Sequence, residues 1–422
     1  MHRATCACVL IFGTLVGCAG SFDPRPIDEI GFLERSQTQE REGVRVTVAV
    51  PSRKETRALF ADDLYRRGVQ PIWIEIENLR DEEVTYLPVG TDPHYYSALE
   101  AANLDAEDVE DAKDERRNRY FFDASFDLWL DPGEGRAGFV FTNLDEGSKA
   151  FNVDVTGRND PVSFTFFVPV PGLKIDHYEV DWDGLYPPER IRELDQQTLI
   201  DAIAEFTCCA TDKKGEGTAD PLNIVIIGSP RDIYYSFLRA GWDETETISR
   251  ASTMKTVRSF LTGGEYRYSP VSSLYAFGRK QDIAFQKARE NINERNHLRL
   301  WISPARFEGK PVWIGQISRD IGVHFTRKTI TTHKIDPNVD ETREYLLEDL
   351  AYAQTVEKFG YALGVGAAPV DAPRGNLTGD PYFTDGYRLV LWLSSTPADI
   401  ADIEFVPWAL PPYRRDPEDV QP

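Results

Sequence analysis

The sequence predicts an α+β protein in which a β-sandwich precedes a second domain with a mostly antiparallel sheet. Two observations lead to this fold class. Residues 43–180 hold short runs of alternating apolar and polar residues separated by Asn, Asp and Gly, which is typical of half-buried strands. Residues 220–398 instead interleave apolar strands with helical patterns, without a regular strand–helix–strand repeat. Between them, residues 181–219 are expected to form a linker helix and a loop.

In the first domain, the alternation is clearest in the run that begins at Val44, where every second residue is valine. Short strands joined by turn-rich connections predict an immunoglobulin-like sandwich. Residues 92–120 break this pattern, because Ser97 precedes an Ala-rich stretch and then an acidic run, and a helical insertion is expected there. Strands are expected at 44–50, 72–78, 138–141, 150–155 and 163–168.

The second domain is preceded by residues 187–209, whose apolar residues follow a helical spacing and predict the linker helix. The continuous apolar run 222–228 predicts a buried strand, and Pro230 predicts the start of a helix that Gly241 ends. Residues 399–422 are expected to be a tail, disordered from Pro411. The other expected elements are helices at 251–262 and 337–354 and strands at 273–278, 297–303, 311–318 and 387–394.

The N-terminus resembles the signal of a bacterial lipoprotein. Residues 1–17 are a short basic and apolar segment that ends in Leu-Val-Gly, and Cys18 follows. The resemblance implies that Cys18 is lipidated and becomes the membrane anchor, with 18–42 as a tether. An Asp after the Cys often retains such proteins in the inner membrane. Ala19 takes its place, so we expect a cell-envelope protein in the outer membrane, facing the periplasm.

Composition excludes some partners. The formal net charge of −22 argues against nucleic acid, which needs a basic footprint, and against an anionic lipid surface. Once residues 1–17 are removed and Cys18 is lipidated, only Cys208 and Cys209 remain. Because adjacent cysteines rarely bridge, we expect small buried side chains at a helix end, with a disulfide as the less common alternative.

The C-terminal half resembles the LssY C-terminal domain family over about residues 220–395. The family is found appended to bacterial membrane proteins, some with phosphatase-like portions, and the resemblance carries over no catalytic residue. The stretches that carry it include Asn223–Ser229, Ala240–Trp242, Ser269–Ser272, Phe277–Gln286, His297–Trp301, Val312–Gly315, Thr332–Asp340 and Thr384–Arg388.

A candidate ligand site lies on the two strands expected at 297–303 and 311–318. His297, Arg299 and Trp301 share one face of the first strand because alternate side chains do. In a simple hairpin register, Trp301 lies opposite Trp313 and Arg299 opposite Gly315. The guanidinium is then expected to lie flat against the Trp rings and hold an anion, or else to pair with a structural acid.

A second candidate site lies before the expected helix at 337–354. Asp336 followed by Pro337 predicts an N-cap, and a helix N-terminus with His333 beside it attracts anions. A metal interpretation uses His297, His333, Asp320 and Asp336 as ligands, although their spacing matches no metal motif and we expect no metal.

Two further features are expected near these sites. Arg279 and Asp282 are additional ligand-binding candidates that are expected to pair at the start of a helix, and the polar loop 376–386 is a candidate cover for a pocket. The sequence has no Gly-x-Ser-x-Gly elbow, no His-Glu-x-x-His, no Walker-type loop and no dinucleotide fingerprint. No cofactor follows from the residues.

The leading hypothesis is therefore a binding or scaffolding lipoprotein that recognises an anionic ligand or an envelope partner protein. The alternative is an envelope hydrolase, for example a metal-dependent one that acts on phosphoesters, with His297 or His333 as base and Asp320 or Asp336 assisting. In a third interpretation, these polar residues are only structural.

Overall fold

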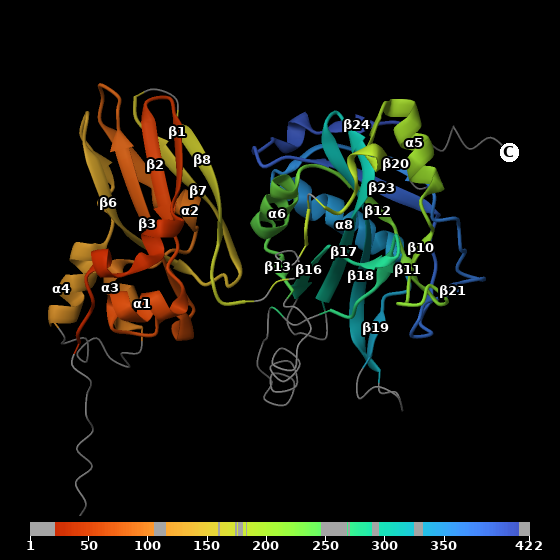
Figure 1. Cartoon of the computed structure of the whole chain (residues 1–422), viewed down its shortest axis with the longest axis horizontal. Coiled ribbons are helices and arrows are strands. Elements are labelled where there is room, and N and C mark those ends of the chain that lie inside the picture. The colour runs from red at the N-terminus through yellow and green to blue at the C-terminus, as the bar shows by residue number, and fades with distance from the viewer. Residues whose placement is uncertain are drawn as a thin grey trace, which may run out of the picture.

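The computed structural model describes residues 22–104, 115–158, 161–173, 175, 180–182, 184–245, 268, 271–288, 295–324 and 332–412. It has two domains that lie side by side (Figure 1). Both contain mainly antiparallel sheets, as expected for the α+β class. Among the described residues, no helix is long and apolar enough to cross a membrane. The expected helix at 251–262 and the residues of the tail after 412 lie outside the described residues.

The N-terminal domain is built from two four-stranded antiparallel sheets. Because side chains alternate along each strand, apolar residues from both sheets meet in one core that includes Val46, Ile74, Val153 and Phe164. The first sheet has the order β1 (Gln37–Arg41), β2 (Val44–Ala49), β3 (Val69–Asn78) and β6 (Gly135–Asn143). The second has the order β5 (Trp129–Leu130), β4 (Val84–Leu87), β7 (Ser148–Thr156) and β8 (Val162–Pro169).

Three helices form a second core with the outer face of the first sheet: α1 (Arg53–Phe60), α3 (Ala98–Asn103) and α4 (Glu115–Ala124). Ser52 and Ser97 start α1 and α3 with capping boxes. The helices α3 and α4 confirm helical structure in the expected insertion at 92–120. A short further helix, α2 (Pro88–Thr91), precedes them.

The tether expected over 18–42 is shorter in the structure. Phe32 is fully buried under α1, and β1 is an edge strand of the sandwich. Gln37 and Gln39 donate side-chain hydrogen bonds to the backbone oxygens of Phe167 (2.7 Å) and Thr165 (2.6 Å) in β8. These bonds occupy carbonyls on the edge of the second sheet, which would otherwise be open to another strand.

The C-terminal domain is organised around one large mixed sheet. Its strand order is β13-β16-β17-β18-β12-β23-β20-β24, with β9 paired to β17 and β19 paired to β18. Only β12–β23, β17–β9 and β20–β24 pair in parallel among these strands. The bounds are β9 (Arg192–Leu194), β12 (Ile224–Ile227), β13 (Asp243–Glu244), β16 (Ile283–Ala288), β17 (Arg295–Phe307), β18 (Lys310–His324), β19 (Thr332–Ile335), β20 (Val356–Leu363), β23 (Tyr387–Leu393) and β24 (Glu404–Val406).

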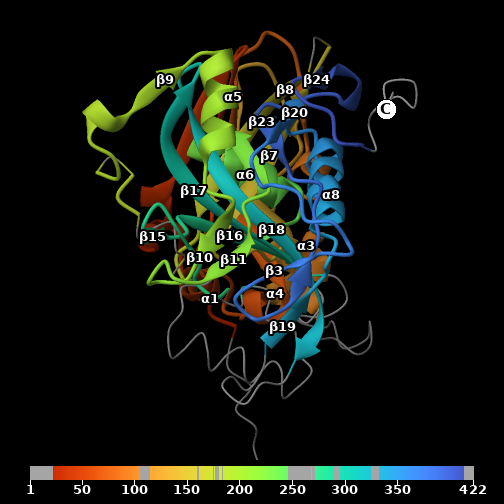
Figure 2. The same ribbon diagram turned by 90° about the vertical axis from the view of Figure 1, so that its right-hand side faces the viewer.

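Helices cover both faces of this sheet. On one face, α6 (Pro230–Arg239) and α8 (Val339–Tyr352) bury residues such as Phe237 and Leu346 against the strands. On the other face, α5 (Gln196–Glu205) buries Leu199 and Ile203 (Figure 2). The helix expected as a linker over 187–209 is therefore part of the C-terminal domain, and the expected tail contributes β24 to its sheet.

A small sheet covers the remainder of the α5 face. Its order is β11 (Thr218–Pro221), β10 (Cys209–Thr211), β14 (Tyr275–Ala276) and β15 (Arg279–Lys280). It shares a core with Trp301 and Ile314 of the long strands. The short hairpin of β21 (Arg374–Gly375) and β22 (Pro381–Tyr382) brings Arg374 and Tyr382 to Cys208 and Cys209, at the start of β10.

The two domains meet through α6. Phe167 of β8 packs on Tyr234, with ring centroids 5.4 Å apart, and Arg231 donates to the backbone oxygen of Thr165 at 3.1 Å. At the end of this junction, Ser148 of β7 donates to Glu244 of β13 at 3.1 Å. Aromatic packing and hydrogen bonds therefore both join the domains.

Candidate functional site

The platform expected on the hairpin of β17 and β18 does not form. The observed register places Arg299 opposite Gln316 and Trp301 opposite Ile314, one residue away from the expected pairing. Because one residue reverses the face of a side chain, Trp313 lies in the core under α6 and α8, whereas Trp301 lies under the small sheet. Gly315 lies opposite Leu300, and the atoms nearest to a Cβ built on it belong to Leu300, Ile224 and the Arg299 backbone, not to a guanidinium.

Arg299 is instead buried, with 4% of its surface exposed. Its Nη1 donates to Gln316 Oε1 at 2.8 Å and its Nε donates to the backbone oxygen of Ser272 at 3.1 Å. Burial lowers the pKa of the Arg299 guanidinium, and the same effect raises the pKa of the nearby Asp220 carboxyl. Gln316 joins the two residues, since its Nε2 lies 3.3 Å from Asp220 Oδ2. These contacts favour the second expectation for Arg299, in which the side chain is held by partners within the protein and does not bind an anion.

His297 and Asp320, both proposed as catalytic, do come together. His297 Nε2 lies 2.8 Å from Asp320 Oδ2, and both side chains are almost fully buried. Burial, together with the charges of Arg295 and Arg299, lowers the pKa of His297 well below its usual range. The imidazole is therefore neutral at neutral pH. Arg295 Nε lies 3.8 Å from the same carboxylate oxygen and partly balances its charge.

The Arg279–Asp282 pair is confirmed, but it joins strands and does not start a helix. The two side chains form a bidentate ion pair with distances of 2.9 and 2.8 Å. Asp282 Oδ2 also accepts from the backbone nitrogen of Ile302 at 2.7 Å, and Arg279 donates to Tyr186 Oη at 2.7 Å. The pair thereby fastens β15 to β17, which is a structural role.

The expected cap of the last long helix is displaced. Asn338, and not Asp336, is the N-cap of α8, and its side chain accepts from the backbone nitrogen of Glu341. Asp336 Oδ1 accepts from the backbone nitrogen of Asn338 at 2.9 Å. His333 is in β19 opposite Val323, and its side chain lies outside the described residues. The structure therefore does not bring Asp336 into the His297–Asp320 pair through any described contact.

The loop 376–386, a candidate cover, is fastened to the domain at both ends. Asn376 Nδ2 donates to Asp220 Oδ1 at 2.8 Å. Asp385 forms a bidentate pair with Arg343, which is fully buried, with both distances 3.0 Å. Burial tends to lower the pKa of Arg343, but the hydrogen bond with Asp385 and the charge of Asp340 raise it overall. The guanidinium is therefore permanently charged and holds the loop against α8.

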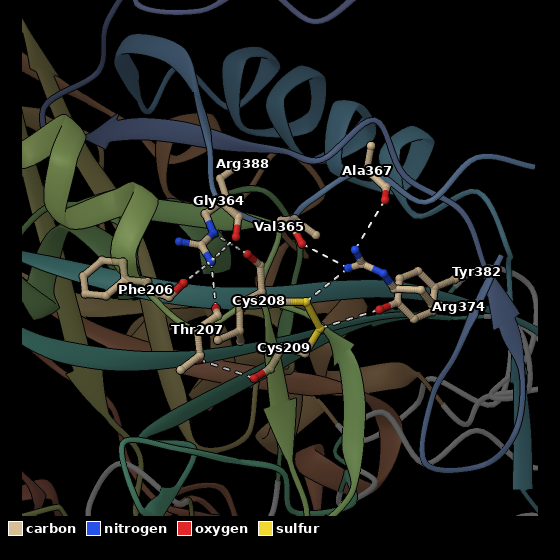
Figure 3. The surroundings of a disulfide bond; sticks show 11 residues. Phe206, Thr207, Cys208, Cys209, Gly364, Val365, Ala367, Arg374, Tyr382 and Arg388 are labelled. Carbon is tan, nitrogen blue, oxygen red and sulfur yellow. Dashed lines mark hydrogen bonds between the residues drawn. A yellow bond between two sulfur atoms is a disulfide. The ribbon is translucent and has the colours of Figure 1, made fainter. Parts of the chain in front are cut away.

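A site that the sequence interpretation did not select surrounds Cys208 and Cys209, which form a disulfide (Figure 3). Both cysteines and Arg374 line an open pocket of about 430 Å³. Arg374 Nη1 donates to Cys208 Sγ at 3.4 Å, and Tyr382 Oη donates to Cys209 Sγ at 3.6 Å. The same Arg374 guanidinium donates to the backbone oxygens of Val365 (3.1 Å) and Ala367 (3.3 Å). The disulfide between Cys208 and Cys209 is the less common of the two states that were expected for these cysteines.

Arg388 holds the segment before the disulfide. Its guanidinium donates to the backbone oxygens of Ile203, Phe206 and Thr207, at the end of α5. It is fully buried and its Nε also donates to the Leu222 oxygen at 2.9 Å. Arg388 thus ties the start of β10 to β23. The adjacent cysteines themselves were the only sequence signal for this pocket, since Arg374 lies far away in the chain.

The family comparison agrees with the motifs of the C-terminal half. Residues 201–387 match the family described as LssY C-terminus. The disulfide pocket, Arg299, His297, Asp320 and Arg343 all lie inside the matched range. No curated protein matches the chain in a sequence search. Among the described residues, no group of three or more His, Cys, Asp and Glu side chains is placed to hold a metal ion.

Proposed function

We propose that the protein is a lipid-anchored binding protein of the cell envelope whose LssY C-terminal domain binds a small anionic ligand. The observation that carries this proposal is the position of Arg374 in the wall of the open pocket beside the disulfide. This residue replaces Arg299, which was the expected anion ligand and is buried among its own partners.

The electrostatics of the pocket support an anion. The described partners of the Arg374 guanidinium are two backbone oxygens, a sulfur and the nearby Tyr382 hydroxyl, all neutral groups. Its positive charge is therefore available to a ligand, unlike that of Arg343, which Asp385 neutralises. Guanidinium groups bind carboxylates and phosphates through paired hydrogen bonds. The hydroxyl-bearing side chains of Thr211 and Thr218 line the same pocket and add polar groups.

The pocket rests on rigid elements. Arg374 is in the β21–β22 hairpin, whose loop Asn376 fastens to Asp220, and the disulfide is at the start of β10, which Arg388 anchors. A ligand group placed between the two would meet side chains that are already oriented, so little conformational entropy is lost on binding.

The hydrolase alternative has one observation in its favour, the 2.8 Å contact between His297 Nε2 and Asp320 Oδ2. A neutral imidazole held by a carboxylate can act as a general base. Both groups are buried, however, together with the buried side chains of Arg295 and Arg299 on β17. The hydrolase alternative therefore predicts a hydrolytic activity that His297→Gln abolishes, while this variant still binds a ligand at Arg374.

The remaining parts of the proposal concern location. Lipidated Cys18 would hold the protein at the outer membrane, facing the periplasm. The immunoglobulin-like sandwich would then act as a spacer or as a docking module for a partner protein. The short link between Cys18 and the first packed residues supports a domain held close to the membrane surface, because Phe32 and β1 already belong to the folded domain.

The test is a titration with inorganic phosphate and with succinate, followed by thermal unfolding. A ligand that binds only the folded state raises its unfolding temperature. We expect wild type to be stabilised and Arg374→Gln to lose this effect. The matched control is Arg306→Gln, which removes an exposed arginine that donates to a backbone oxygen elsewhere in the domain. Equal stabilisation of the wild type and Arg374→Gln by both anions would refute the proposed site.

A further inference from the structure

The disulfide offers a chemistry that anion binding does not use. Cys208 is partly exposed in the pocket, whereas Cys209 is 7% exposed. Each sulfur also has its own hydrogen-bond donor, Arg374 for Cys208 and Tyr382 for Cys209 (Figure 3). The pocket of about 430 Å³ is large enough for a small organic molecule. One sulfur is thus open to attack, and both are placed beside groups that stabilise negative charge on sulfur.

We propose that Cys208–Cys209 is a thiol–disulfide exchange site whose substrate is a small thiol that carries a carboxylate, or the disulfide made from such a thiol. The preference for a carboxylate rests on the proposed anion site at Arg374. The exchange reaction itself rests only on the disulfide and its accessibility.

The reaction balances in two steps. The thiolate of the first substrate attacks Cys208 Sγ, the Cys208–Cys209 bond breaks, and the electron pair moves to Cys209 Sγ, to which the Tyr382 hydroxyl donates. The second thiolate attacks the substrate sulfur of the mixed disulfide and displaces the Cys208 thiolate beside Arg374. Two thiols are oxidised to one disulfide, and the protein disulfide is reduced to two thiols. A guanidinium next to a sulfur favours its thiolate form.

The surrounding fold favours the reverse reaction as well. Arg388 holds the backbone of Phe206 and Thr207, and the backbone nitrogen of Leu222 donates to the Cys208 oxygen at 2.8 Å. These bonds do not involve the sulfur atoms and persist when the disulfide is reduced. The two thiols then stay adjacent, so that attack of one on a mixed disulfide of the other is intramolecular and fast.

The first experiment compares three thiols on the purified full-length chain: 3-mercaptopropionate, 2-mercaptoethanol and cysteamine, at equal thiolate concentration. After alkylation, mass spectrometry counts the reduced cysteines over time. We expect the anionic thiol to react about tenfold faster than the cationic one, which corresponds to about 1.4 kcal/mol of attraction. Arg374→Gln should remove this difference in rate between the thiols, and Arg374→Lys should keep most of it.

The outcomes separate the two proposals. If all three thiols reduce the disulfide at the same rate, the exchange site stands and the anion site fails. If anions stabilise the protein at Arg374 but none of the thiols reduces the disulfide, the exchange proposal is overturned.

Single-cysteine variants test the assigned order of attack. Cys209→Ser leaves Cys208 in the pocket, and we expect it to form mixed disulfides faster than the Cys209 thiol of Cys208→Ser. Equal rates in two folded variants would overturn the assignment of Cys208 as the attacked sulfur.

Discussion

We expect Glu244 to make the junction between the two domains sensitive to pH. Glu244 is 1% exposed, and Ser148 of the sandwich donates to its Oε1 at 3.1 Å. Burial, with the negative charges of Asp243 and Asp145 nearby, raises the pKa of Glu244 to about 8. Tyr268 and Glu146 line the same small cavity, and Tyr268 Oη accepts from the backbone nitrogen of Glu146 at 2.7 Å.

The magnitude follows from proton linkage. The folded state binds one more proton than the unfolded state between the ordinary pKa of 4.5 and the folded pKa of about 8. In this window the free energy of unfolding falls by about 1.4 kcal/mol for each pH unit. The full loss is therefore roughly 4–5 kcal/mol, an upper value that any relaxation of the junction reduces. The contribution of the neutral Glu244 carboxyl to the free energy of unfolding is complete below pH 4.5 and lost above about pH 8.

The substitution Glu244→Gln keeps the shape and the contact with Ser148 but cannot ionise. Urea unfolding of both proteins at about pH 5 and about pH 8 gives the free energy of unfolding at each pH. We expect wild type to lose several kcal/mol more than the variant on going to the higher pH, whereas the exposed control Glu205→Gln should follow the wild type. The same pH dependence in wild type and Glu244→Gln would refute a neutral, buried carboxyl at the junction.

Three further predictions concern single residues. Arg343→Met should lower the free energy of unfolding by about 3–5 kcal/mol, because it leaves the Asp385 carboxylate, whose side chain is 11% exposed, without the buried guanidinium that binds it; thermal or urea unfolding measures this loss. Gly315→Ala should lower it by about 1–3 kcal/mol, because a Cβ would lie 2.6 Å from Leu300 Cδ2 and 2.9 Å from the Arg299 oxygen; a variant as stable as the wild type would contradict this packing. Cys18→Ser should abolish labelling by a radioactive fatty acid in a bacterial host and move the protein from the membrane fraction to the aqueous one, whereas unchanged labelling would exclude Cys18 as the lipidated residue.

Local chemistry explains the elements that were predicted correctly. The apolar run before Gly228 forms the central strand β12. All four of its residues are buried, because the sheet is covered on both faces and alternate side chains point to opposite faces. Pro230 then lies at the first position of α6, as expected from the sequence, and Ser229 and Asp232 form a capping box there that the sequence analysis did not name. Such signals lie within a few residues of one another, and no distant contact is needed to interpret them.

The hairpin register shows where local signals were insufficient. The turn between β17 and β18 has two residues, Glu308 and Gly309, with φ angles of 51° and 73°. A two-residue turn pairs Phe307 with Lys310, and the irregularity between Ile302 and Arg306 shifts the register by two residues. A shift of two preserves the face of every side chain, so Trp301 could not lie opposite Trp313. The prediction that Trp301 lies opposite Trp313 was based on a longer loop between the two strands.

The sequence by itself determined the acidic charge, the strands and helices with strong local signals, and the LssY C-terminal motifs. The tertiary structure alone decided the pairing of Arg374 with Cys208, 166 residues apart, and the burial of Arg299. Hydrophobic periodicity fixes which face of an element is apolar, but it does not fix which distant elements meet there. Buried charges find their partners only after the sheet has formed, because the cost of burying an unpaired charge selects among the contacts that the packed chain allows.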